Sequence, residues 1–332
     1  MISLIEDLKQ IYRFLRFRRR MNDRFPSAIG FEMTTRCNAL CPMCVRRDYQ
    51  IVNEDMDFSF LEKTVAEVAK WPRRQILFNL TGLSEPTLYP RLIESVAYVK
   101  QHIPESNVRI ITNGIAMTSD LSKGLIHAGL NEMIISLNGA NRDDYLALCG
   151  IDAYEKVTEN IAALLENRRL LKSTTLRINL NLKRHESNTA DIQNASSYWK
   201  PFFGNEDIVT ISNVLPIRLD APINRCGDIL SRYPCGHLWG EIKLDIHGNL
   251  YPCDGKVMGY KYRENSELFL GNIRDISIKE AYLSSKVRDF RKIHLEGRFD
   301  ILPTCQSCPS WSIFPNYWIR NEFFPFLKKM WL

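Results

Sequence analysis

The sequence has no apolar run long enough to span a membrane and no secretion signal. A membrane-spanning helix takes about 20 apolar residues. The stretch from Leu8 to Arg20 mixes Lys, Tyr, Phe and Arg, and no small-residue cleavage site follows it, so it is not a signal peptide. We therefore expect a cytoplasmic protein, and cytoplasmic proteins rarely contain disulfides.

Internal repeats, low-complexity tracts and a charge excess in the body of the chain are also absent. The formal net charge of +6 comes largely from the two ends, from Arg13, Arg16, Arg18, Arg19, Arg20, Lys328 and Lys329. A nearly balanced body gives no electrostatic reason to expect a nucleic-acid partner. The 332 residues, 45% of them hydrophobic, exclude a disordered chain and are enough to bury a core.

Between about residues 28 and 213, short β-branched runs alternate with amphipathic stretches, which is typical of βα units around a parallel sheet. The predicted strands are Ala28–Thr34, Ile76–Thr81, Val108–Thr112, Met133–Leu137, Thr175–Leu180 and Ile208–Ile211, and the predicted helices are Phe60–Lys70, Arg91–His102, Ser119–Ala128, Tyr154–Leu171 and Thr189–Trp199. This pattern predicts an α/β fold, a partial (β/α)6 TIM-like barrel whose chemistry lies at the carboxyl ends of the strands.

A second module begins after residue 213, in a stretch that contains Pro216, Pro222 and Pro234. A hairpin over 242–253 and a helix over Ile278–Ile293 are expected there. The predicted organisation is a basic amphipathic segment (1–27), the barrel (28–213), a small β-hairpin-plus-helix module (214–310) and an aromatic tail (311–332).

The nine cysteines point to metal in a reducing compartment, and three of them, Cys37, Cys41 and Cys44, lie within eight residues directly after the first predicted strand. Thiolates are the preferred protein ligands of iron-sulfur clusters. Three ligands would leave one iron of a cubane open to a small chelating molecule. Zinc is the competing interpretation, but structural zinc takes four ligands and no fourth Cys or His is near in sequence.

The spacing C-x3-C-x2-C, within Met33-Thr34-Thr35-Arg36-Cys37-Asn38, closely resembles the start of the radical S-adenosylmethionine (SAM) superfamily core. Three further motifs resemble that family in order, each at the end of a predicted strand: Thr81-Gly82-Leu83-Ser84-Glu85-Pro86, Thr112-Asn113-Gly114 and Ile135-Ser136-Leu137-Asn138-Gly139. Each alone could be an ordinary strand-to-helix turn. The resemblance implies a [4Fe-4S] cluster that cleaves SAM to a 5′-deoxyadenosyl radical, with Ser84, Glu85, Thr112, Asn113, Ser136 and Asn138 binding SAM.

Cys149 precedes Gly150 where the family often has an Arg that meets the SAM carboxylate. The resemblance suggests that Arg177, on the fifth predicted strand, supplies the missing charge. A thiol at position 149 could donate a hydrogen atom to a radical, or it could be a small buried apolar residue.

Cys235, Cys253, Cys305 and Cys308 have the spacing C-x17-C-x51-C-x2-C, which resembles the twitch form of the SPASM module. The resemblance implies one auxiliary [4Fe-4S] cluster with four protein ligands. A four-cysteine zinc site fits the same ligands. Cys226 could be a distal ligand, a radical quencher or a spare thiol. The candidate catalytic residues are Cys149, Cys226 and Asp254, which directly follows Cys253.

The layout is similar to that of 2-deoxy-scyllo-inosamine dehydrogenases, which implies oxidation of a sugar or aminocyclitol, with an electron passing to the auxiliary cluster and a base removing a proton. The alternatives are epimerisation with a cysteine hydrogen donor, and maturation of a ribosomal peptide. Only 36 residues precede Cys37, too few for a leader-binding domain. A zinc scaffold without activity is the non-enzyme alternative. A small-molecule or peptide substrate and a flavodoxin- or ferredoxin-type reductant are the expected partners.

Both ends combine apolar and basic side chains. Leu4, Leu8, Ile11 and Leu15 recur at helical spacing opposite Arg13, Arg16 and Arg20, and the stretch 311–332 is rich in aromatics beside Lys328 and Lys329. Such segments could contact a membrane surface or dock on the barrel.

Overall fold

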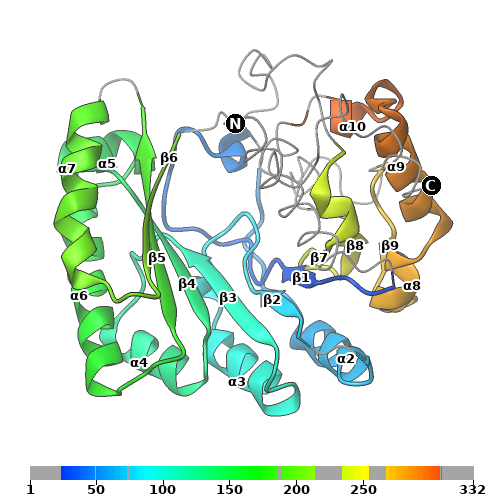
Figure 1. Ribbon diagram of the computed structural model, residues 1–332, viewed down its shortest axis with the longest axis horizontal. Coiled ribbons are helices and arrows are strands. Elements are labelled where there is room, and N and C mark those ends of the chain that lie inside the picture. The colour runs from blue at the N-terminus through cyan, green and yellow to red at the C-terminus, as the bar shows by residue number, and fades with distance from the viewer. Residues whose placement is uncertain are drawn as a thin grey trace, which may run out of the picture. The chain divides into compact units, whose positions relative to one another are not determined.

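The computed structural model describes residues 24–48, 50–72, 75–185, 188–213, 234–253, 267–306 and 308. They fall into two compact units (Figure 1). The larger unit contains the described residues between 30 and 213 and the turn 245–247, and the smaller unit contains the other described residues. The predictions made for the two ends of the chain concern residues outside the described ranges.

The larger unit is built on a parallel sheet. Strands β2 (Leu77–Asn79), β3 (Asn107–Thr112), β4 (Glu132–Asn138), β5 (Arg177–Arg184) and β6 (Ile208–Asn213) pair in parallel in the order β6-β5-β4-β3-β2, and β1 (Ala28–Phe31) comes next. The intervening elements are η1 (Val45–Asp48), α2 (Phe58–Val68), η2 (Pro86–Leu88), α3 (Leu92–His102), α4 (Ser119–His127), α5 (Arg142–Cys149), α6 (Tyr154–Leu170), α7 (Thr189–Trp199) and η4 (Lys200–Phe202). The predicted α/β partial barrel is confirmed.

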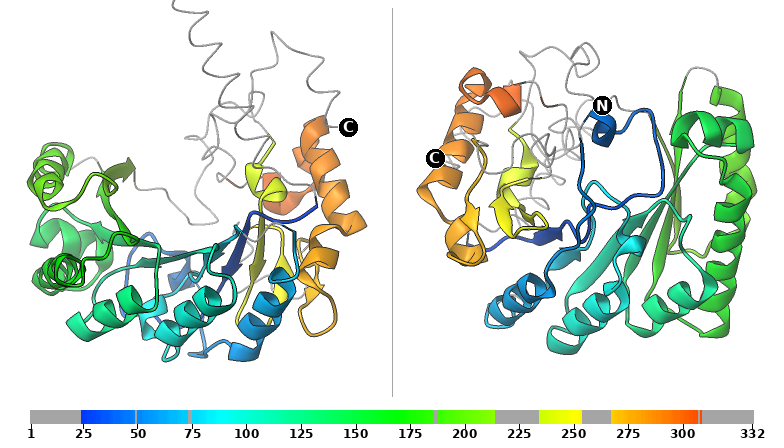
Figure 2. Two further views of the ribbon diagram at one scale, coloured as in Figure 1. Left: turned by 60° about the horizontal axis from the view of Figure 1, so that its bottom comes forward. Right: turned by 180° about the vertical axis from the view of Figure 1, so that it is seen from behind.

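The two faces of this sheet differ in polarity, as β5 illustrates. Its buried residues Ile178, Leu180 and Leu182 alternate with the half-buried Asn179, Asn181 and Lys183. The helices α3, α4, α6 and α7 lie on one side of the sheet (Figure 2), and the apolar residues face them. The other, inner face therefore carries a row of polar side chains.

Near the site, the sequence-based prediction gave one strand the wrong bounds and missed one helix. Strand β5 starts at Arg177 and runs on to Arg184, four residues beyond its predicted end, because β4 and β6 offer pairing partners along its whole length. Helix α5, which carries Cys149, was not predicted. It begins after Asn141, whose side chain accepts a hydrogen bond from Asp144 N, and ends at Gly150 in the left-handed conformation.

The smaller unit contains the predicted hairpin, formed by β7 (Glu241–Leu244) and β8 (Asn249–Tyr251), with β9 (Gly271–Asn272) antiparallel to β8. Its helical elements are η6 (Gly236–Trp239), α8 (Ile278–Tyr282), α9 (Ser285–Glu296), η8 (Phe299–Ile301) and α10 (Pro303–Gln306). The single helix expected over 278–293 is two, because the Ser284 side chain accepts from Val287 N and starts a new helix. Within the described ranges, no helix has the length and apolarity needed to cross a membrane.

Candidate functional site

Hydrogen bonds join three of the predicted motifs at the carboxyl ends of the first strands. The backbone N–H of Glu85 donates to the Arg36 carbonyl (2.9 Å), and the Asn113 side chain donates to Asn38 Oδ1 (2.8 Å). Asn113 N donates to the Glu85 carboxylate at 2.7 Å. The loop that carries Cys37 is thus fixed to the ends of β2 and β3.

Glu85 is a buried carboxylate, 2% exposed, at the centre of this network. It accepts hydrogen bonds from Thr112 Oγ1 (2.6 Å), Asn113 N, Thr87 N (3.1 Å) and Thr87 Oγ1 (2.6 Å). Burial raises the pKa of Glu85, and the four donors offset part of that rise. Beside it, Ser84 Oγ accepts from Arg46 Nη1 at 2.6 Å. Glu85 is well suited to bind a cationic group such as an ammonium.

Asn138 and Ser136 lie where β4 ends. The register with β5 shifts between them, and Asn138 has a φ of 62°. Its Nδ2 donates to the Cys149 sulfur at 3.4 Å. Its Oδ1 is buried and has no hydrogen-bond partner among the described residues, which leaves an acceptor for a hydroxyl of a bound molecule.

Cys149 lies against the cysteine loop. It is fully buried, and its carbonyl accepts a hydrogen bond from Leu40 N at 2.9 Å. The Cys41 thiol donates to the Cys149 sulfur, which raises the pKa of Cys41 and lowers that of Cys149. The environment of Cys149 is that of a small buried residue that supports the cluster loop.

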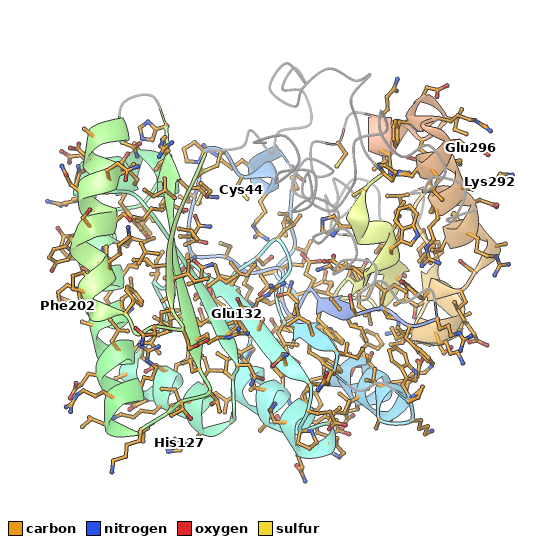
Figure 3. The ribbon with its side chains drawn as sticks, in the orientation of Figure 1. Cys44, His127, Glu132, Phe202, Lys292 and Glu296 are labelled. Atoms are coloured by element: carbon orange, nitrogen blue, oxygen red, sulfur yellow. The ribbon has the colours of Figure 1, made fainter. Side chains whose placement is uncertain are left out.

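Arg177 is not brought to this site. It begins β5 opposite Glu132, at the amino end of the sheet, whereas Ser136 and Asn138 lie at the carboxyl end. Figure 3 shows Glu132 well separated from Cys44. The suggestion that Arg177 supplies the charge missing at position 149 is therefore wrong. Sequence reasoning placed Arg177 correctly on the fifth strand but misjudged where that strand starts and ends.

A histidine–carboxylate pair that sequence reasoning missed lies at the end of β5. His185 Nε2 is 2.5 Å from Asp144 Oδ1, and the two residues are 41 positions apart. Asp144 Oδ2 accepts from Ala140 N (2.7 Å) and from the Asn188 side chain (2.8 Å). The Asp144 side chain is only 6% exposed and that of His185 is 26% exposed, so a fixed carboxylate orients an accessible imidazole.

The chemistry of the donor set at the first site fits an iron-sulfur cluster. Cys37, Cys41 and Cys44 are half-buried thiols on one short loop, and burial raises the pKa of Cys37, an effect that a bound metal reverses. Within the described ranges, no group of three or more His, Cys, Asp or Glu side chains is arranged to hold a single metal ion.

The second cysteine group lies in the smaller unit. Cys235 precedes η6, Cys253 follows β8, and Cys305 in α10 is followed by Cys308, whose N–H donates to the Cys305 carbonyl at 3.1 Å. Cys253 and Cys305 pack with an apolar cluster of Leu238, Trp239, Tyr251, Leu268, Phe290, Leu295 and Leu302. Cys235 N donates to Nδ1 of the buried His294 at 3.1 Å. Cys253 and Cys305 thus lie in an apolar environment that suits an iron-sulfur cluster with four protein ligands.

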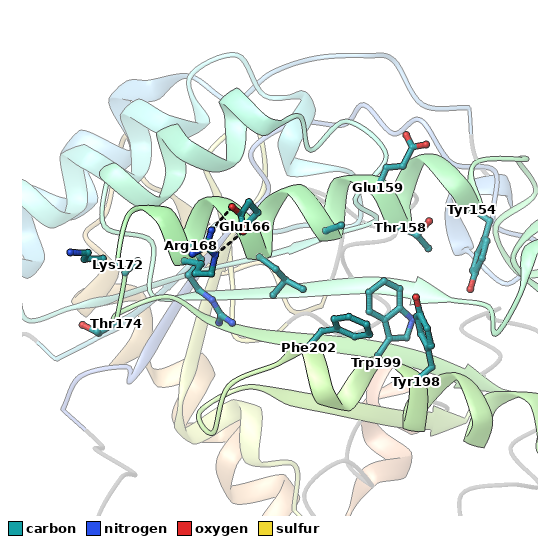
Figure 4. A pocket seen from close by; sticks show the side chains of 14 residues that line it. Tyr154, Thr158, Glu159, Glu166, Arg168, Lys172, Thr174, Tyr198, Trp199 and Phe202 are labelled. Carbon is teal, nitrogen blue, oxygen red and sulfur yellow. Dashed lines mark hydrogen bonds and ion pairs between the residues drawn. The ribbon is translucent and has the colours of Figure 1, made fainter.

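Two candidate catalytic residues, Cys226 and Asp254, lie outside the described residues. A cavity of ≈ 1040 Å³ lies elsewhere in the larger unit, against α6 and η4, and is shown in Figure 4. Aromatic side chains of Tyr154, Tyr198, Trp199 and Phe202 line it, and none of the predicted site residues does. It is not the site that the motifs define.

Comparison with known proteins agrees with this geometry. The Radical SAM superfamily matches residues 31–182, and the SPASM iron-sulfur cluster-binding domain matches residues 235–309. A tungsten-containing aldehyde ferredoxin oxidoreductase cofactor-modifying protein of Pyrococcus furiosus is 22% identical over 313 residues, covering 83% of this chain and 85% of that protein. A GTP 3′,8-cyclase of Chlorobaculum tepidum is 29% identical over 164 residues, but the match spans only 47% of that enzyme and 48% of this chain.

Among solved structures, BtrN in complex with AdoMet (SAM) and 2-DOIA has a TM-score of 0.58 at 17% identity, covering 86% of this chain and 94% of that chain, which is a likeness of fold. The two domain matches, together with the motifs that meet at the strand ends, identify the chain as a radical SAM superfamily enzyme with a SPASM domain, whose cofactors are SAM and [4Fe-4S] clusters.

Proposed function

We propose that this enzyme dehydrogenates an alcohol carbon of a small polar metabolite, such as a sugar or aminocyclitol. Oxidation of an alcohol to a ketone removes a hydrogen atom, a proton and an electron. The observation that carries the proposal is the pair formed by Asp144 and His185 just after the carboxyl end of β5, because dehydrogenation needs a base that takes the hydroxyl proton.

When bound, SAM and the reduced cluster supply a 5′-deoxyadenosyl radical, which removes the hydrogen atom. Cys37, Cys41 and Cys44 would hold that cluster, Glu85 would bind the SAM ammonium, and Asn138 Oδ1 would accept from a SAM hydroxyl. His185 takes the hydroxyl proton of the substrate, while Asp144 keeps the imidazole oriented and stabilises its charged form. Cys235, Cys253, Cys305 and Cys308 would hold the electron acceptor.

The inner face of the sheet favours a polar substrate. Thr210 donates to Asn179 (3.0 Å) and Ser212 donates to Asn181 (2.9 Å), so amide and hydroxyl groups from β5 and β6 form rows on that face. These groups can exchange hydrogen bonds with substrate hydroxyls. The fold likeness to BtrN, which binds 2-DOIA together with AdoMet, supports a small substrate in such a barrel.

The surroundings of Cys149 favour dehydrogenation over epimerisation. An epimerase needs a thiol that can reach the substrate radical and return a hydrogen atom to it. The Cys149 sulfur is fully buried and already interacts with Cys41 and Asn138. A sulfur held against a cluster ligand is a poor donor for a substrate.

The test is an anaerobic assay of the reconstituted enzyme with SAM, a flavodoxin or dithionite, and a panel of sugars and aminocyclitols in deuterium oxide. We expect substrate-dependent 5′-deoxyadenosine and a ketone with no new carbon-bound deuterium. His185→Gln should keep SAM cleavage but lose ketone, and the exposed His127→Gln is the matched control. A product that gains one carbon-bound deuterium would instead mean epimerisation.

A further inference from the structure

Lys183 is a half-buried cation on the inner face of the sheet, near the predicted SAM site. It lies near the carboxyl end of β5, on the face of the strand that also carries Asn179 and Asn181. Ser212 is its partner in β6. In the β4–β5 register, Asn138 pairs with Leu182, the residue just before Lys183. Lys183 is therefore next in sequence to the residue that pairs with Asn138, the side chain that we propose accepts from a SAM hydroxyl.

Among the described residues, Lys183 has a hydrogen-bond partner but no counterion. Its Nζ donates to Ser212 Oγ at 2.9 Å, and that hydroxyl donates onward to Asn181 Oδ1 at 2.9 Å. Burial lowers the pKa of Lys183, and no charged neighbour among the described residues opposes that effect. The ordered hydroxyl and amide thus fix the position of the ammonium but do not neutralise it.

In the part of the chain that the structure describes, the other charged groups at this end of β5 do not provide a counterion. Arg184 adds a second cation, and its buried Nε has no hydrogen-bond partner among the described residues. The carboxylate of Asp144 is already bonded to His185, Asn188 and Ala140 N. A half-buried ammonium with no counterion among the described residues is available to bind an anion beside it.

We propose that Lys183 binds a carboxylate or phosphate group of a molecule held on the inner face of the barrel. The anion has two possible sources, the carboxylate of SAM and an acidic group of the substrate. Charge-assisted hydrogen bonds from a positioned ammonium are strong and favour anions over neutral groups.

This inference deepens the proposed function and rests on it for the identity of the substrate, because it favours an acidic or phosphorylated sugar. Two ammonium groups brought close together at a partly buried site repel each other, so an aminocyclitol would have to place its amine away from Lys183. Among relatives, the GTP 3′,8-cyclase is named for a phosphate-bearing substrate, although it matches only about half of this chain.

The experiment measures binding and needs no turnover, so its outcome is separate from that of the dehydrogenation assay. Lys183→Met, Lys183→Arg and a control, Lys156→Met on the exposed face of α6, are reconstituted anaerobically. Equilibrium dialysis gives the affinity for SAM and for decarboxylated SAM, which keeps the amine and sulfonium but lacks the carboxylate. The rise in unfolding temperature on addition of inorganic pyrophosphate tests whether the substrate provides the anion.

If SAM provides the anion, Lys183→Met lowers the affinity for SAM about tenfold or more and leaves that for decarboxylated SAM unchanged. If the substrate provides it, SAM affinity is kept, but the rise in unfolding temperature with pyrophosphate, seen in the wild type and Lys156→Met, is lost. Lys183→Arg retains the wild-type behaviour in either case. Wild-type affinity and wild-type pyrophosphate response in Lys183→Met together would overturn the proposal.

Discussion

Replacing Gly150 by alanine tests how the cysteine loop is held in place. Gly150 ends α5 with a φ of 68° and a ψ of 14°, in the left-handed region. A Cβ at this position would lie 2.3 Å from the Leu40 carbonyl oxygen and 2.9 Å from its carbonyl carbon. Since both atoms are backbone, the loop between Cys37 and Cys41 has to move away.

Two costs add in this variant. An alanine in the left-handed region costs about 1–2 kcal/mol. Displacing Leu40 also breaks the 2.9 Å hydrogen bond from Leu40 N to the Cys149 carbonyl, which costs about 1 kcal/mol more. We expect a total of about 2–3 kcal/mol, together with a weaker first cluster because its ligands lie on the displaced loop.

Gly129→Ala in the same unit is the matched control. Gly129 follows α4 with a φ of 87°, and its added Cβ would meet Lys100 Cγ at 3.3 Å, part of a flexible side chain that can move. Its cost should be the backbone strain alone, about 1–2 kcal/mol. The amount by which Gly150→Ala destabilises the protein more than Gly129→Ala does therefore measures the contact with the cysteine loop.

Hydrogen exchange of the amides of β4 and β5, followed by mass spectrometry, measures the stability of the larger unit in both variants. Iron content and electron paramagnetic resonance of the reduced protein report on the first cluster. We expect lower protection and less iron in Gly150→Ala than in Gly129→Ala. Equal protection and full iron content in the two variants would show that Gly150 does not support the loop.

Three further predictions concern the ligands and two buried carboxylates. Replacing Cys37, Cys41 and Cys44 together by alanine should halve the iron bound after reconstitution and abolish 5′-deoxyadenosine formation, whereas unchanged SAM cleavage in an oxygen-free assay would refute the ligand assignment. Glu85→Gln should destabilise the protein by about 1–3 kcal/mol, because the amide cannot accept from all four donors, and should weaken SAM binding in dialysis. Burial would raise the pKa of Asp207, but Arg168 and the N–H groups of Ile178 and Gly204 hold that pKa below its usual value. The ionised Asp207 therefore stabilises the folded protein above the unfolded-state pKa, and this stabilisation is lost as the pH falls through the folded-state pKa. Asp207→Asn should therefore lower the free energy of unfolding, measured with urea, by about 2–3 kcal/mol near neutral pH. The difference in this free energy between the variant and the wild type should narrow below about pH 4, and a difference that does not depend on pH would contradict the prediction.

The local pattern of the sequence was sufficient for the fold class, the cysteine groups and the order of the motifs. Alternating β-branched runs and amphipathic stretches depend on neighbouring residues only, and so does the spacing of Cys37, Cys41 and Cys44 on one loop. The hairpin over β7 and β8 was also predicted, because its turn chemistry is local. Helix α5 was missed because it is short, and the break at Ser284 because a single hydrogen bond makes it.

Only the tertiary structure decided which charged groups reach the site. The suggestion for Arg177 was wrong because the register of β5 against β4 and β6 depends on residues distant in sequence, and the same register places Lys183 near the carboxyl end of β5. The pairs Asp144–His185 and Asn38–Asn113 join positions 41 and 75 residues apart. No local pattern encodes such contacts, since parallel strands that are neighbours in the sheet are separated in the chain by a whole crossover connection.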